Sequence, residues 1–246
     1  MSWTINNFTG EFEKDNKRYI RQITSTLSEP TGFKDRTESD FTFTDGSRTL
    51  EVTVVGTSYY IWFAGVRHLI DSAEDIIITD VEGIHVIYFD TDDALHEVVN
   101  PTDAEVATLI TDKVLVCYMY WDATNNEGVY VGEERHGTIM DGHTHNYLHF
   151  TRGMQIQTGL GLGDFVIGAG TLDTHAQFGS EAGVTDDEDL FIDVDAVVST
   201  TGYSVLYRMG ATGLWRTDTQ ANFSVLNDPA GRVYYNQYTA GAWQQT

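Results

Sequence analysis

The chain has 246 residues, of which 41% are hydrophobic and 12% aromatic, and this composition excludes an intrinsically disordered protein. It carries 37 acidic residues against 14 basic ones, a formal net charge of -23. A surface of this charge repels a phosphate backbone, so we expect no nucleic-acid partner. The acidity is typical either of a protein from a halophilic host, where molar salt shortens the Debye length to about 3 Å, or of an ordinary acidic surface protein.

Cys117 is the single cysteine and excludes an intrachain disulfide. It lies in the apolar run 114–121, where we expect a buried and inert thiol. No apolar stretch reaches the roughly 18 residues of a transmembrane helix, so we expect no membrane span. The N-terminus lacks a basic start followed by an apolar run and predicts no signal peptide.

Residues 1–38 are polar, with scattered aromatic side chains and no periodicity, which favours an N-terminal arm that attaches to a partner. The next region, 39–121, is predicted to be a β domain. Residues 41–44 and 48–54 alternate around Asp45-Gly46, the pattern of a hairpin. Further strand patterns follow at 59–63, 66–70, 76–79, 84–89 and 114–121. Such short, closely spaced strands predict an antiparallel β-sandwich or barrel-like module.

One short helix is predicted over residues 104–110, with Thr102 or Asp103 as its N-cap. Residues 122–183 are rich in Gly, His and Thr and predict a loop-rich segment. Within it, Gly159-Leu-Gly-Leu-Gly163 lacks the lysine of a phosphate loop, so we interpret it as a place of close backbone approach. A second β region is predicted over 184–246, with strands at 190–194, 203–207, 214–216 and 232–238 and a last strand that ends abruptly.

Residues 133–149 combine histidines with carboxylates: Glu133, Glu134, His136, Asp141, His143, His145 and His149. In an extended strand, His143 and His145 would point to one face about 6.5–7 Å apart and could share a metal ion or line an axis. Imidazole suits zinc, iron, nickel and copper. We predict His143 and His145 as metal ligands, against the alternative that these histidines only satisfy backbone groups. There is no HExxH motif and no recognised nucleophile motif, so we expect no enzyme.

Two acidic runs, 91–93 and 185–189, could hold calcium or magnesium, but neither follows the EF-hand spacing. We therefore expect both to be solvated loops. Trp121, Trp215 and Trp243 could stack on sugars, although core packing or a subunit interface is the favoured interpretation for each.

Several segments resemble a family of tailed-phage virion proteins, the tail-fibre or minor tail proteins. The most specific is Tyr120-Trp-Asp-Ala-Thr-Asn125 followed by residues 132–137, 140–149 and 151–153. The others are 31–39, 41–50, 59–65, 82–90, 186–189, 234–238 and 241–245, so the resemblance spans roughly residues 30–246. It implies a place in the virion near the tail tip and no catalytic residues. Trimeric phage fibres can hold a metal between HxH pairs on the threefold axis, so it also implies a possible six-histidine transition-metal site.

We therefore expect a virion structural protein, a tail-fibre or baseplate subunit that links the tail tip to host-recognition parts. It would be made in the host cytoplasm and assemble as a homo-oligomer, with a trimer favoured, beside other virion tail proteins and a host surface receptor. The alternatives are a receptor-binding adhesin for carbohydrate or a surface layer, and a head decoration or turret protein. A glycan-degrading enzyme would need a paired-carboxylate site, and no pair stands out among so many acids.

Overall fold

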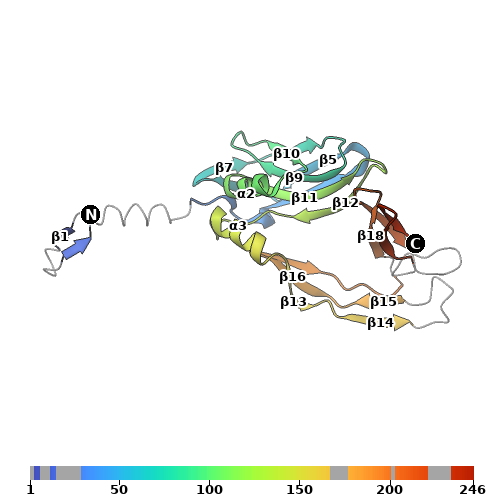
Figure 1. Ribbon diagram of the computed structural model, residues 1–246. Helices are drawn as coiled ribbons and strands as arrows, with labels where there is room; N and C mark the ends of the chain where they lie inside the picture. The colour runs from blue at the N-terminus through green and yellow to red at the C-terminus, as the bar shows by residue number, and fades with distance from the viewer. Residues whose placement is uncertain (1–2, 6–11, 15–28, 167–176, 201–202, 221–233) are drawn as a thin grey trace.

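The computed structural model describes residues 3–5, 12–14, 29–166, 177–200, 203–220 and 234–246 (Figure 1). Their architecture is mainly β, built from small antiparallel sheets with two α-helices and no closed barrel in these ranges. The mainly β, antiparallel fold predicted from the sequence is confirmed. No helix in the described ranges is long and apolar enough to cross a membrane.

The upper body in Figure 1 is a sandwich of sheets. One layer consists of two three-stranded sheets: β3 (Gly32–Phe33), β6 (Tyr59–Phe63) and β7 (Val66–Ile70), and β4 (Ser39–Thr44), β5 (Thr49–Val54) and β8 (Glu74–Ile77). The other layer is a four-stranded sheet in the order β10 (Leu95–Val99), β9 (Gly83–Phe89), β11 (Val114–Asp122) and β12 (Glu127–Glu133).

The main core lies between these layers and includes Phe33, Leu50, Tyr59, Phe89 and Trp121, all fully buried. Cys117 is buried in the same core, and this burial raises the pKa of its thiol far above the ordinary value. The expectation of an inert thiol in a core strand is therefore consistent with the structure, as is the expectation that Trp121 packs in the core.

Helix α2 (Asp103–Asp112) covers the outer face of the four-stranded sheet. Its N-terminus is a capping box, because Thr102 accepts from the backbone N–H of Glu105 while the Glu105 carboxylate accepts from that of Thr102. Leu109 and Ile110 pack against Val86 of β9 and Leu115 of β11. The predicted helix and its N-cap are confirmed.

The hairpin predicted around Asp45-Gly46 forms as expected, and the strands predicted at 59–63 and 66–70 pair as a second hairpin. Between β4 and β5 lies the short 3-10 turn η2 (Asp45–Ser47), and Arg48 closes it with a φ of 56°. Between β6 and β7 the turn residues Ala64 and Gly65 have φ values of 45° and 81°, as a tight hairpin with positive φ at both central positions requires.

The boundaries of this body differ from those predicted. Phe33 lies in the core, so the sandwich begins inside the predicted 1–38 arm. The 3-10 turn η1 (Arg36–Glu38) then connects β3 to β4. Strand β12 extends the sheet to Glu133, beyond the predicted limit at 121. Strand β10 was not predicted, because its sequence LHEVV has no clear alternation. Of the arm itself, β1 (Trp3–Ile5) pairs with β2 (Phe12–Lys14), and residues 15–28 lie outside the described residues.

The prediction that residues 122–183 form a loop-rich segment is wrong in large part. After β12, helix α3 (Gly142–Thr151) leads into a long β-ribbon that runs beneath the sandwich (Figure 1). The ribbon pairs β13 (Gln155–Gly159) with β16 (Gly183–Asp187) and β14 (Leu162–Val166) with β15 (Gln177–Ser180), and β17 (Leu190–Val194) adds a third strand beside β16. Glycine-rich strands of this kind lack the apolar alternation by which strands are recognised.

Two hairpins end the described chain: β18 (Tyr203–Met209) with β19 (Leu214–Gln220), and β20 (Asn236–Thr239) with β21 (Ala242–Gln245). The first is fixed to the sandwich by Arg216, whose guanidinium lies 2.7 Å from Glu82 and 3.0 Å from the buried Asp122. These strands agree with the predicted second β region, although the predicted strand 232–238 is shorter in the structure and its first two residues lie outside the described ranges.

Candidate metal centre

Three separate elements bring histidines and carboxylates together below the sandwich. The loop after β12 contributes two of them, helix α3 two more, and the turn between β16 and β17 the last two. We refer to this group as the histidine–carboxylate cluster: Glu134, His136, His145, His149, Glu188 and Asp189.

Asp141 is the N-cap of helix α3, and its side chain accepts from the backbone N–H groups of His143 and Thr144. His145 and His149 are four residues apart and so lie on one face of the helix, and both face the cluster. His143 lies on the exposed side. The expectation of an extended strand with His143 and His145 on the same face is therefore wrong.

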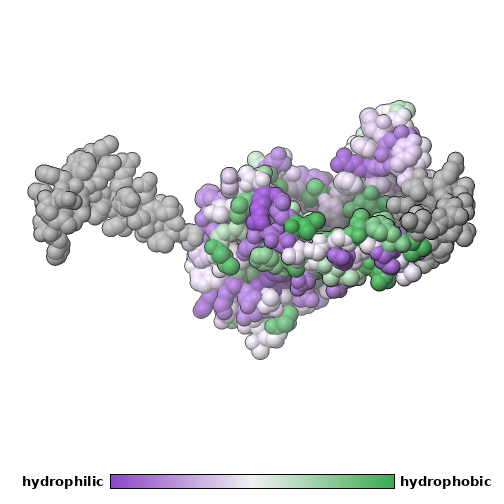
Figure 2. All heavy atoms as spheres, turned by 90° about the horizontal axis from the view of Figure 1, so that it is seen from below, coloured by the Kyte–Doolittle hydropathy of each residue, from purple (hydrophilic) through white to green (hydrophobic). Residues whose placement is uncertain are grey.

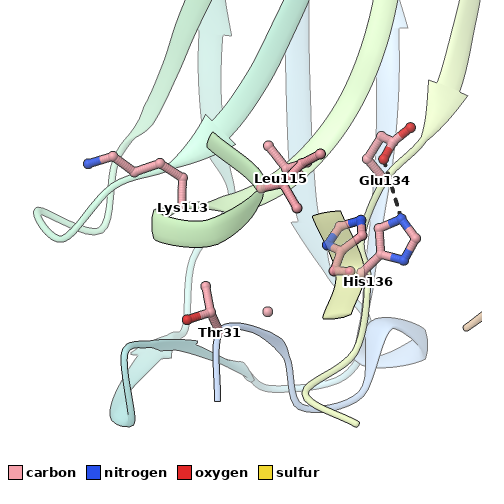
Figure 3. Close-up of a pocket in the computed structure, with 8 residues that line it drawn as sticks. Thr31, Lys113, Leu115, Glu134 and His136 are labelled. Carbon is pink, nitrogen blue, oxygen red and sulfur yellow. Dashed lines mark hydrogen bonds and ion pairs between the residues drawn. The ribbon is translucent and has the colours of Figure 1, made fainter. Parts of the chain in front are cut away.

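His136 is held by carboxylates on both sides of its ring. Its Nδ1 lies 2.7 Å from Asp189 Oδ1, and the other oxygen of Asp189 accepts from the backbone N–H of Gly137. Its Nε2 lies 3.3 Å from Glu134 and 3.6 Å from Glu188. Figure 3 shows the Glu134–His136 pair beside a second imidazole. Asp189 therefore orients the ring so that Nε2 faces the interior of the cluster.

Several polar atoms of the cluster are buried without a hydrogen bond. They are His145 Nε2, His149 Nδ1 and both carboxylate oxygens of Glu188. Glu188 Oε1 and His149 Nδ1 are 3.8 Å apart and form only a loose ion pair. A buried polar atom without a partner costs about 1–3 kcal/mol, so native proteins rarely contain four in one place.

The same burial shifts the titration of these groups. Burial and the neighbouring charge of Asp187 raise the pKa of Glu188 to about 8. For His145, burial and the charges of His136 and His149 lower the pKa to about 3. Burial opposes the charged form of His136 as well, but its hydrogen bonds with Asp189 and Glu134 outweigh burial and raise its pKa to about 9.

Next to the cluster is a small pocket with about 10 Å³ of free space, about what one water molecule needs. Figure 3 shows Thr31, Lys113, Leu115, Glu134 and His136 around it. A space of this size fits a water molecule or a metal ion, and the imidazoles and carboxylates of the cluster can bind either of them or a proton.

Within the described ranges, two overlapping sets of residues each place one ligand atom per residue within 4.8 Å of the others. One is His136, His145 and Glu188, and the other is Glu134, His145 and His149. Of the two predicted ligands, His145 belongs to both sets and His143 to neither. The segment 133–149, which stands out in the sequence by its histidines and carboxylates, contains Glu134, His136 and His149. No sequence pattern linked these residues to Glu188.

The acidic run at 185–189 is not the solvated loop that was predicted. Asp186 is buried in an ion pair with Arg152, and Asp189 binds His136. The run at 91–93 does lie in an exposed turn, where Asp92 and Asp93 pair with nearby histidines.

The other two predicted sugar-stacking candidates, Trp215 and Trp243, lie around the guanidinium of Arg208, at 4.6 Å and 5.5 Å from their ring centroids. Their rings are thus engaged with a side chain of the same hairpin pair, in agreement with the favoured packing interpretation.

Comparisons with protein-family models, with curated proteins and with solved structures gave no match to this chain.

Proposed function

We propose that this chain is an oligomeric structural subunit of a tailed-virus particle, a tail-fibre or baseplate component that links the tail tip to host-recognition parts. The observation that carries the oligomeric part of this proposal is the exposed apolar ribbon of β13, β14 and β17. The viral part is supported by the sequence resemblance over roughly residues 30–246.

The ribbon carries large apolar side chains that no other part of the described ranges covers. Ile156 on β13, Leu162 and Phe165 on β14, and Phe191 on β17 are each more than 60% exposed. Green apolar patches are visible on this lower side in Figure 2. Ile156 aligns with Thr185 across the sheet whereas Phe191 aligns with Asp186, so these two apolar side chains lie on opposite faces. A sheet whose edge strands expose large apolar side chains on both faces is unusual for an isolated protein and typical of one that is buried on assembly.

Two strands of the ribbon, β13 and β14, are also nearly free of charge, whereas β16 and β17 carry Asp186, Asp187 and Asp193. Between residues 155 and 166 Asp164 is the single charged residue, and its carboxylate accepts from the backbone N–H of Ser199. Every residue of β13 is exposed, and it forms one edge of its sheet. Natural edge strands are usually protected by charged side chains, and interface cores are depleted of charge. In a chain of net charge -23 this local depletion marks a surface for protein contact.

The occupant that we propose is a second copy of the same chain, within a homo-oligomer for which we favour a trimer. Each copy offers an open β edge and an apolar face, so copies can add strands to one another and close the assembly around an axis. Other virion tail proteins would then contact the N-terminal arm or the outer surfaces. The acidic outer surface fits a particle that works in molar salt, where its self-repulsion is screened.

The test is the mass of the purified chain by light scattering in molar salt, for the wild type and for Phe165→Lys. Ile77→Lys is the matched control, because Ile77 is 62% exposed on β8 and Phe165 is 63% exposed on β14. We expect an oligomer for the wild type and Ile77→Lys, and a monomer for Phe165→Lys. A monomeric wild type, or equal masses for the two variants, would refute the proposed interface.

The viral part is tested separately on purified particles of the virus that encodes the chain. We expect mass spectrometry to detect the chain in particles, and antibody labelling to mark the tail. Absence from particles, or labelling confined to the head, would contradict a tail function while leaving the interface intact.

A further inference from the structure

We propose that the histidine–carboxylate cluster binds one divalent transition-metal ion inside each chain, with His136, His145 and Glu188 as ligands and Glu134 or His149 completing the coordination. This site is independent of the oligomer described above, since all of its residues come from one chain.

The spacing of the ligand atoms fits such an ion. When two donor atoms each lie about 2.0–2.1 Å from a tetrahedrally coordinated ion, they are about 3.3–3.4 Å from each other. In the cluster, His136 Nε2 lies 3.3 Å from Glu134 and 3.6 Å from Glu188, while His149 Nδ1 lies 3.8 Å from Glu188. These pairs would need movements of only a few tenths of an ångström to reach that separation, and the ligand atoms of His136, His145 and Glu188 all lie within 4.8 Å of one another.

Unpartnered atoms point to a missing ligand. Glu188 is 8% exposed and His145 is 7% exposed, yet neither carboxylate oxygen of Glu188 nor Nε2 of His145 has a hydrogen bond. These are the atoms that a metal ion would satisfy. Without it, the cluster holds two buried carboxylates, Glu134 and Glu188, and the half-buried Asp189 beside imidazoles, and a divalent cation supplies the opposite charge.

The surroundings of His136 have the form usual around metal-bound histidines. Asp189 accepts from Nδ1 and is itself fixed by the backbone N–H of Gly137, so the second nitrogen is free to face the ion. Such carboxylate–histidine pairs fix the ring orientation and raise the basicity of the ligand nitrogen. Asp189 is thus a positioning residue and not a ligand.

The donor set selects the metal class. Calcium and magnesium prefer oxygen ligands, whereas a set with imidazole nitrogens suits zinc, cobalt, nickel or iron. The ligands are mostly buried and come from the β12 loop, α3 and the β16–β17 turn. The ion would therefore cross-link these three elements and hold the base of the ribbon against the sandwich, as structural metal sites do.

The experiment uses the full chain without a polyhistidine tag, stripped with a chelator and titrated with Co²⁺ and then Zn²⁺. We expect visible absorption bands from bound Co²⁺, saturation at one equivalent per chain, displacement by Zn²⁺, and a higher melting temperature with Zn²⁺. His145→Ala should lose the Co²⁺ bands and weaken Zn²⁺ binding at least 100-fold.

His143→Ala is the matched control, because His143 is two residues away on the same helix but exposed. It should bind like the wild type, which separates the buried site from adventitious binding at surface histidines. If His145→Ala fails to fold, Glu188→Gln supplies the second variant, with the Co²⁺ bands as its readout. A wild type without Co²⁺ bands or Zn²⁺ stabilisation, or equal losses in His143→Ala and His145→Ala, would overturn the proposal.

Discussion

His143 and His145 lie on opposite sides of helix α3, although a single residue separates them in the sequence. Two residues along an α-helix correspond to a rotation of about 200°. His145 is therefore buried against the β12 loop with its ring centroid 4.1 Å from that of His136, whereas His143 is exposed. His136, the histidine that His145 contacts in the cluster, is nine residues away in the sequence, so an HxH pattern could not identify it.

We predict that Asp189→Asn weakens Zn²⁺ binding by about 10- to 100-fold without abolishing it, because the amide no longer holds the proton on His136 Nδ1 as the carboxylate does. A competition titration with a coloured zinc chelator measures the change. Asp92→Asn, which alters an exposed carboxylate paired with His96, should leave the affinity unchanged. An unchanged affinity in Asp189→Asn would show that this residue does not position a ligand.

Phe33→Ala should destabilise the chain by about 3–5 kcal/mol, because the side chain is fully buried against Tyr59 and Phe89. Urea unfolding followed by tryptophan fluorescence gives the free energy of unfolding. Ile77→Ala, at an exposed site, should cost less than about 0.5 kcal/mol. Equal effects would mean that residues near 33 belong to the arm after all.

Arg216→Met should lower the free energy of unfolding by about 3–5 kcal/mol, since it leaves the buried Asp122 and the carboxylate of Glu82 without their cation. Arg67→Met is the control, because Arg67 is exposed over the ring of Tyr60 and has no carboxylate within ion-pair distance in the described part of the chain. Chemical unfolding of both variants gives the comparison, and a loss below about 1 kcal/mol in Arg216→Met would contradict the anchoring of the β18–β19 hairpin by this residue.

Lys113→Met should reduce stability at pH 7 by up to about 1 kcal/mol, with the difference from wild type disappearing in acid. Lys113 hydrogen-bonds both oxygens of Asp90 at 2.6 Å and so lowers the pKa of Asp90. Because the folded pKa lies below the unfolded value of about 3.9, the pair stabilises the fold above that value. This contribution is lost as the pH falls through the folded pKa.

Thermal melts between pH 2 and pH 7 measure this dependence, with Lys34→Met as the control because Lys34 lies over an aromatic ring and has no carboxylate partner among the contacts described. If the stability difference between Lys113→Met and the wild type stays constant through the acid range, the pH dependence does not come from the ion pair of Lys113 with Asp90.

Local patterns were sufficient for most of the sandwich. The alternation around Asp45-Gly46 predicted one hairpin, the strand patterns at 59–63 and 66–70 correspond to β6 and β7, and the predicted N-cap Thr102 lies where α2 begins. In each of these cases the signal lies within about ten residues and the side chains involved are in contact with near neighbours in sequence.

The histidine–carboxylate cluster could not be predicted in the same way. Its carboxylate Glu188 and its positioning residue Asp189 lie more than 50 residues after His136, and an acidic run normally indicates a solvated loop. Helix α3 was missed because its sequence GHTHNYLHFT contains few strong helix formers and presents no apolar stripe. Tertiary contacts with α2 and the histidines stabilise it instead.

The most direct measurement is native mass spectrometry of the untagged chain after loading with Zn²⁺ and dialysis, because it counts chains and metal ions in one experiment. The account predicts an oligomer of identical chains that carries one zinc ion per chain. One ion per three chains would place the metal on a shared axis and contradict the intrachain site. A metal-free monomer would contradict both the site and the proposed assembly.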